Sequence, residues 1–152
     1  MEKFDIKLVC AYETRPMISV KIVEYFKHFV LTNILVPKNI IIHSKPNILL
    51  AFTLMETGGK LSSEVKVLKS QTVGGDKFYP IIIPMDQIWT NNTSMKIIEL
   101  FFEAVKLFFI KNYKRIKSDF FDELWQMIDL PYLLNLPYPA PIKEVKYIGD
   151  TE

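Results

Sequence analysis

The sequence predicts a mixed α+β fold, in which an antiparallel β meander of about four to six strands packs against one long apolar helix. One N-terminal helix and one short C-terminal helix complete this prediction. Two observations indicate it. Residues 94–113 are apolar over more than half of the helical circumference, and residues 39–85 contain short runs of strand-forming residues separated by turn residues.

A single domain is expected from the size of the chain. A length of 152 residues fits one domain, and a hydrophobic content of 49% with 13% aromatic residues is enough for a sizeable core. This composition argues against intrinsic disorder. We therefore expect residues 1–152 to form one α+β domain, on which the proline-rich residues 131–152 pack as a C-terminal tail.

The N-terminal region reads as a strand followed by a helix. Apolar side chains alternate over residues 3–12, which is typical of a half-buried strand. Between residues 17 and 33 the apolar positions recur at helical spacing, so the first helix is expected there, although several of its residues are β-branched.

The middle of the chain has β character. Gly58-Gly59 and Gly74-Gly75 are expected to form tight hairpin turns, because glycine supplies the positive φ that such turns require. Pro80 has no N–H, so its strand should be at an edge of the sheet or bulged at that residue. The short connections favour antiparallel neighbours. Strands are expected at residues 39–44, 48–56, 61–72 and 77–85.

The second half of the chain is expected to be mainly helical. Residues 94–113 leave only a narrow polar strip, so this helix should be buried on most sides. Residues 118–128 predict a shorter helix, and residues 142–148 are a candidate for a last short strand. The prolines from Pro131 onward predict an irregular or polyproline-like tail.

Charge and cysteine content exclude several classes of function. The net charge of +2 gives no bulk attraction to a polyanion, so nucleic acid is not the expected partner. A single cysteine excludes an internal disulfide, and two histidines leave few metal ligands. No signal peptide or membrane-spanning segment is expected. We predict a protein of the reducing cytoplasm without a metal or cofactor.

No catalytic constellation is recognisable along the chain. The Gly58 and Gly74 turns lack the spacing of a phosphate-binding loop. Cys10 falls on the apolar face of its strand, which favours a buried structural thiol over a nucleophile. A site assembled in space from distant residues stays possible as an alternative, and its candidates would be Asp86, Glu99, His28 and His43.

Two charged clusters follow one another after the long helix. Lys111, Lys114, Arg115 and Lys117 suit the negative end of a helix dipole, and they could also contact phosphates. The next helix is acidic, and aromatic residues accompany it, as in protein–protein interfaces. The residues predicted to bind a partner are Asp119, Asp122, Glu123, Trp125, Tyr132 and Tyr138.

The layout of a strand, a helix, a meander and two helices resembles the small immunity proteins that bacteria encode beside polymorphic or contact-dependent toxins. The segment from Phe78 to Ile83, followed by Asp86 and the helix from Ser94, carries this resemblance. It implies a non-catalytic protein that binds and neutralises a cognate toxin. Many inhibitors of nuclease toxins are acidic, whereas this chain is at +2. A small nucleic-acid-binding module and a small enzyme are the alternatives.

Overall fold

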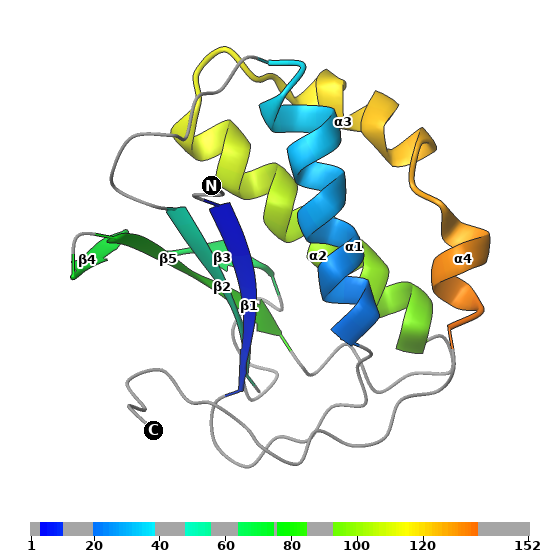
Figure 1. The fold of residues 1–152 in the computed structure, drawn as a ribbon, viewed down its shortest axis with the longest axis horizontal. Coiled ribbons are helices and arrows are strands. Elements are labelled where there is room, and N and C mark those ends of the chain that lie inside the picture. The colour runs from blue at the N-terminus through cyan, green and yellow to red at the C-terminus, as the bar shows by residue number, and fades with distance from the viewer. Residues whose placement is uncertain are drawn as a thin grey trace.

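The computed structural model describes residues 4–10, 20–38, 48–55, 64–74, 76–84 and 93–136. In these ranges a sheet lies on one side of the molecule and the helices on the other (Figure 1). The elements in chain order are β1 (Phe4–Cys10), α1 (Val20–Val30), the π-helical turn η1 (Leu31–Leu35), β2 (Ile48–Met55), β3 (Lys66–Val67), β4 (Gln71–Val73), β5 (Asp76–Pro84), α2 (Thr93–Asn112), α3 (Ser118–Gln126) and α4 (Leu130–Leu134).

The sheet is mostly parallel, so the predicted antiparallel meander is wrong. Its order is β1-β2-β5-β3, with β4 also paired to β5. β1, β2 and β5 run parallel to one another, and only β3 and β4 are antiparallel to β5. A strand–helix–strand unit at the start of the chain is the arrangement that parallel pairing requires. The continuous apolar run of β2 also suits a central parallel strand.

Pro80 lies at a bulge in the interior of the sheet. The pairing of β5 shifts by one residue between its two antiparallel neighbours, because Val67 pairs with Ile81 while Gln71 pairs with Phe78. The Leu68 N–H donates to the Pro80 carbonyl at 2.9 Å, so the side of Pro80 that lacks an N–H faces this irregular segment. The extra residue is in the opposite strand, where residues 68–70 face only residues 79 and 80, while β5 pairs with β2 in unbroken register. The predicted edge position is therefore wrong, and the bulge lies opposite Pro80 and not in its own strand.

The turn between β4 and β5 confirms one of the two predicted hairpins. Gly74 has a φ of +60°, a conformation that glycine adopts without strain. The first predicted hairpin, at residues 57–60, lies outside the described residues, as do the predicted strands at 39–44 and 142–148.

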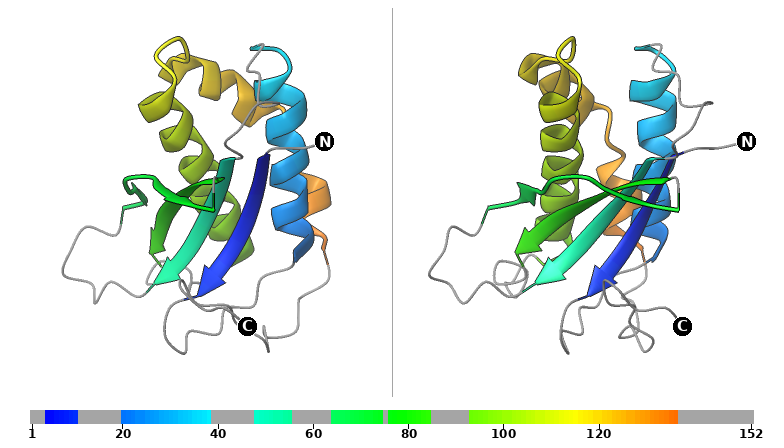
Figure 2. Two further views of the ribbon diagram at one scale, coloured as in Figure 1. Left: turned by 60° about the vertical axis from the view of Figure 1, so that its left-hand side comes forward. Right: turned by 90° about the vertical axis from the view of Figure 1, so that its left-hand side faces the viewer.

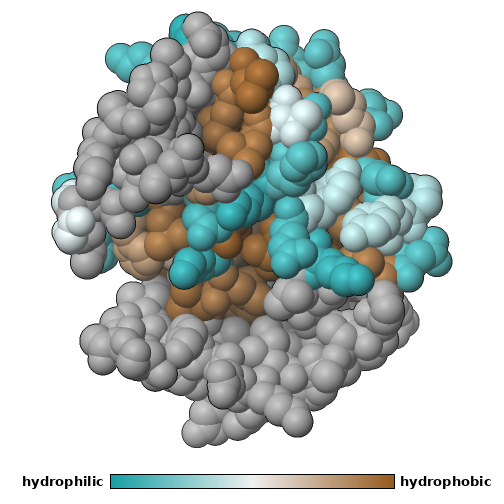
Figure 3. Space-filling model, in the orientation of Figure 1, coloured by the Kyte–Doolittle hydropathy of each residue, from teal (hydrophilic) through white to brown (hydrophobic). Residues whose placement is uncertain are grey.

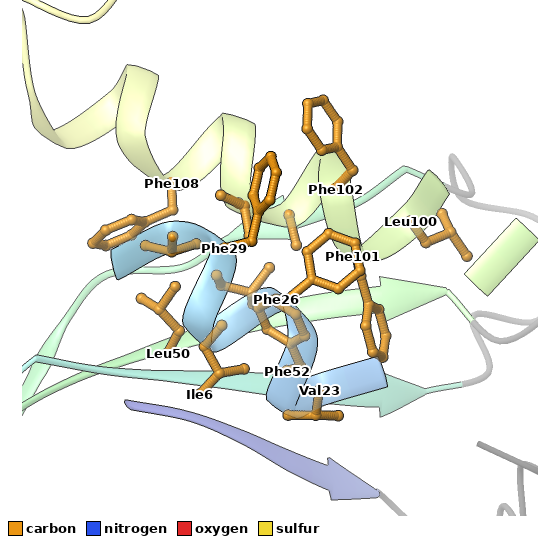
Figure 4. Close-up of a cluster of buried hydrophobic side chains, with 14 of the residues drawn as sticks. Ile6, Val23, Phe26, Phe29, Leu50, Phe52, Leu100, Phe101, Phe102 and Phe108 are labelled. Atoms are coloured by element: carbon orange, nitrogen blue, oxygen red, sulfur yellow. The ribbon is translucent and has the colours of Figure 1, made fainter. Parts of the chain in front are cut away.

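The long helix α2 forms the core together with α1 and the sheet, as its apolar surface predicts. The Phe101 side chain is fully buried, and its ring centroid lies 5.0 Å from that of Phe52 in β2 and 6.0 Å from that of Phe26 in α1. Figure 4 shows these three rings converging between the two helices and the sheet. Burial of aromatic rings is therefore the main contact that joins the layers.

The first predicted helix is confirmed as α1 and continues into η1. In η1 the Val36 N–H donates to the Leu31 carbonyl at 3.2 Å, which is the five-residue spacing of a π-helix. The Asn33 side-chain amide donates to the Phe29 carbonyl at 3.1 Å. η1 ends at Leu35, and the turn that follows brings the Lys38 carbonyl to the α2–α3 connection, where it accepts from the Arg115 guanidinium.

The helices form two groups on the same side of the sheet. α1 and α2 face the sheet, and α3 and α4 pack against these two helices (Figure 2). The chain was expected to become irregular at Pro131, but Leu130–Leu134 forms the short helix α4, in whose first turn a proline is well tolerated. None of the helices in the described ranges combines the length and the hydrophobicity needed to cross a membrane.

Candidate protein-binding face on α3 and α4

The amphipathic helix α3 exposes the acidic side chains that the sequence indicates. Phe121 and Leu124 are buried against the rest of the domain. Asp119, Asp122 and Glu123 are all exposed, and their spacing of three and four residues places them on one side of the helix. The first two turns of α3 thus present three carboxylates to solvent.

Trp125 anchors α3 to α2 and is half-buried. Its ring packs edge-on against Phe102 with a centroid distance of 5.0 Å, and Phe102 also contacts Phe121 at 6.1 Å. Trp125 was predicted as a partner-binding residue. The structure gives it a structural contact as well, so only its exposed part is open to a partner.

Apolar side chains are exposed directly after the acidic residues. Met127 is 56% exposed, and Tyr132 and Leu134 are each 45% exposed. Five large hydrophobic side chains are this exposed among the described residues, and these three lie within eight positions of one another. The surface over α1, α3 and α4 accordingly mixes hydrophilic and hydrophobic patches (Figure 3). Exposed apolar groups beside polar ones are typical of interaction sites.

Asp129 shapes the turn that displays these side chains. Its carboxylate oxygen Oδ1 accepts a hydrogen bond from the Tyr132 N–H at 3.2 Å and so caps α4. Leu133 is buried and holds the helix on the core, while its two neighbours in the chain point outward. The short helix is therefore fixed at one end by a cap and in the middle by an apolar anchor.

Tyr25 of α1 supports the same turn from below. Its hydroxyl accepts a hydrogen bond from the Asp129 N–H at 2.8 Å, and its ring centroid lies 5.9 Å from that of Tyr132. Burial raises the pKa of the Tyr25 hydroxyl above its ordinary value, the hydrogen bond from the Asp129 backbone lowers it, and the Asp129 charge raises it. α1 thus takes part in positioning α4.

These residues together form a surface that we name the α3–α4 face. Asp119, Asp122, Glu123 and Tyr132 were predicted, and the structure places them on it. Tyr138 was also predicted but lies outside the described residues. Of the exposed apolar residues, Met127 and Leu134 were not predicted from the sequence, and neither was the role of Tyr25. The members of the face are Asp119, Asp122, Glu123, Met127, Asp129, Tyr132 and Leu134.

The candidates for catalysis do not converge within the described residues. His28 is exposed, and its Nε2 lies 3.3 Å from the Thr32 hydroxyl. Glu99 is exposed and pairs with Lys96 at 3.7 Å. His43 and Asp86 lie outside the described residues. In the ranges that the structure covers, no three side chains of the metal-ligating types gather to hold an ion.

A second charged surface lies where α2 ends. The Lys111 ammonium donates to the Val67 carbonyl at 2.9 Å, and the Arg115 guanidinium donates to the Lys38 carbonyl at 3.1 Å. Both cations therefore contact segments that are distant in the chain instead of capping their own helix. Lys114 and Lys117 beside them are exposed.

Neither relatives nor structural neighbours identify this chain. No protein-family model, curated protein or solved structure matches it.

Proposed function

We propose that this chain is a non-catalytic protein-binding domain that docks a partner through the α3–α4 face. The observation that carries this proposal is the exposure of Met127, Tyr132 and Leu134 beside a row of carboxylates. Interfaces commonly combine such a small apolar centre with a charged surround that selects the partner. Both helices of the face are fixed to the rest of the domain, since Trp125 anchors α3 while Leu133 and Asp129 hold α4 in place.

The chemistry of the face defines the partner that it suits. Three exposed carboxylates on α3, and Asp129 at the turn, favour a surface rich in lysine and arginine. The apolar centre favours a partner that offers an aliphatic or aromatic side chain between those cations. A basic protein with a mixed surface of this kind fits better than a nucleic acid, which these carboxylates would repel.

The specific function that we propose is that of an immunity protein, which binds a cognate toxin and neutralises it. The support for this proposal is the α3–α4 face rather than the sheet, because the antiparallel meander that contributed to the resemblance is not what the described strands form. Inhibition by occlusion needs no catalytic residue in the inhibitor. It needs a rigid surface, and helices packed on a ring-rich core supply one.

The test is to co-express the chain with the protein that the adjacent gene encodes, to measure binding, and to ask whether that protein is a toxin that the chain neutralises. Reversing Asp119, Asp122 and Glu123 to lysine should weaken the complex by roughly tenfold or more. The control reverses Glu24, Glu64 and Glu99, which are exposed outside the face and give the same change in net charge, and should change affinity by less than about twofold. Equal losses in both variants would remove the face from the proposal. A chain that neither binds nor neutralises such a toxin would contradict the immunity function itself.

A further inference from the structure

A group of cations at one side of the molecule is not used by the proposed function. Three stretches of sequence that contain no Asp or Glu meet there, at residues 31–38, 65–74 and 104–118. They contribute the end of η1, the irregular strand β3–β4, and the end of α2 with the turn that follows. We name their exposed and half-exposed cations the basic strip: Lys38, Lys66, Lys69, Lys111, Lys114, Arg115 and Lys117.

Contacts between side chains and distant backbone carbonyls join the three stretches into one surface. Lys111 reaches the Val67 carbonyl, which lies between Lys66 and Lys69 in the chain, and Arg115 reaches the Lys38 carbonyl. The Lys38 ammonium also lies 4.2 Å from the centre of the Phe120 ring. These contacts join the three stretches but neutralise no charge. The three cations contact two backbone carbonyls and an aromatic ring, and none of these groups is a carboxylate.

The charge of the strip is not compensated by ion pairs. The ion pairs found among the described residues join Lys27 to Asp5 and Lys96 to Glu99, and neither involves the strip. Along the chain its nearest acidic neighbours are Glu64 before it and Asp119 after it. Among the described residues none of these seven cations has a paired anion, and such a group produces a positive potential that a polyanion would relieve.

We propose that the basic strip binds the phosphate backbone of a nucleic acid. The contact is electrostatic and independent of base sequence, since lysine and arginine donate to phosphate oxygens. The rings nearest to the strip are already packed, with Phe120 under Lys38 and Tyr113 against Phe109 at 5.5 Å. Base stacking on these rings is therefore not part of the proposal.

The shape of the strip favours a chain-like polyanion over a flat anionic membrane. The α2–α3 turn and the end of η1 stand at the top of the molecule, and β3 lies at mid-height (Figures 1 and 2). The exposed aliphatic residues Val36 (74%) and Leu68 (42%) belong to opposite ends of this path, the first near Lys38 and the second beside Val67. A phosphate backbone needs only the cations, whereas stable binding to a bilayer would also need apolar side chains grouped for insertion, and these two come from separate stretches of the chain.

The experiment measures binding of the full chain to a fluorescent oligonucleotide of mixed sequence, single-stranded and duplex, at increasing salt. If four phosphates are contacted, the logarithm of affinity for the single strand should fall with a slope of about −2.8 against the logarithm of salt. Affinity should then drop about fiftyfold between 50 and 200 mM salt.

Matched charge reversals locate the site. Lys114→Glu with Lys117→Glu should weaken binding by about tenfold or more and flatten the salt dependence, because each phosphate contact that is lost on the single strand makes the slope about 0.7 less negative. Within the described residues the side chains of these two lysines make no hydrogen bond or ion pair, so folding should be unchanged. The control, Lys7→Glu with Lys77→Glu, makes the same change in net charge outside the strip, at lysines that form no ion pair among the described residues.

Three outcomes would overturn the proposal. The first is no binding at low salt. The second is an equal loss in the control variant, which would indicate an effect of net charge alone. The third is binding to vesicles containing phosphatidylserine without binding to oligonucleotides, which would assign the strip to a membrane surface. None of these measurements involves the toxin, so the strip and the proposed function can fail separately.

Discussion

The α3–α4 face and the basic strip are both charged and exposed, but they are built differently. The face places its carboxylates along one helix and exposes apolar side chains among residues close in sequence. The strip collects cations from three distant stretches and joins them by bonds to backbone carbonyls. A net charge of +2 for the whole chain conceals this separation. Total charge is therefore a poor guide to the partners of a protein whose charges are segregated.

The largest effect should follow from a change to the core that both surfaces share. Phe101→Ala removes a fully buried ring between α1, α2 and β2, and should lower the free energy of unfolding by about 3–5 kcal/mol. Urea denaturation measures this. Met127→Ala, at an exposed position of the face, is the control and should cost less than about 1 kcal/mol. Similar costs for the two variants would contradict the assignment of α2 as the core.

A smaller and more local effect is expected at the anchor of α3. Trp125→Ala removes a half-buried ring that packs on Phe102, and should cost about 2 kcal/mol, less than a fully buried ring. It should also weaken partner binding at the face while oligonucleotide binding at the strip stays unchanged. Trp125→Phe, which retains a ring, is the matched control. If both surfaces lost affinity together, they would not be the separate units that the comparison describes.

The contact through which α1 supports α4 should contribute still less to the free energy of unfolding. Tyr25→Phe deletes the hydroxyl that accepts from the Asp129 N–H at 2.8 Å, and we expect a loss of about 1 kcal/mol. Amide hydrogen exchange should become faster in α4 and stay unchanged at the end of α2. Faster exchange at both places would show that Tyr25 supports the whole domain and not this face in particular.

The smallest expected effect is a change in stability at alkaline pH, and it comes from a tyrosine close to the basic strip. Burial raises the pKa of Tyr113 above its ordinary value of 10.0, and Tyr79 adds to the rise. The unfolded chain therefore ionises first, so stability that is complete below about pH 10 is lost as the pH rises through the higher pKa of the folded state. Tyr113→Phe should reduce this loss when unfolding is followed between pH 9 and 11. An unchanged pH profile would contradict the prediction.

The sequence predicted the elements better than their pairing. The spacing of apolar residues located α1, α2 and α3, since amphipathic periodicity is a local property. The parallel sheet depends on how segments cross over one another, which no local pattern records. The continuous apolar run of β2 favours parallel pairing. The glycine turns on either side of residues 61–72 favour antiparallel neighbours, and the prediction followed the turns.

The same contrast applies to the candidate site. The carboxylates at 119, 122 and 123 were predictable, because their spacing places them on the exposed side of a short helix. Met127 lies outside the buried stripe formed by Phe121 and Leu124, so a closer reading of that helix would have found it. The contacts of Tyr25 with Asp129 and of Arg115 with Lys38 join residues 104 and 77 positions apart, and the sequence holds no sign of them.

Hydrogen exchange of the chain alone and in complex with a partner protein that it is found to bind tests the central claim most directly. The account predicts slower exchange in α3, in α4 and at the turn that Asp129 caps, with little change in β1 and β2. Protection confined to the sheet, with α3 and α4 exchanging as in the free chain, would contradict it.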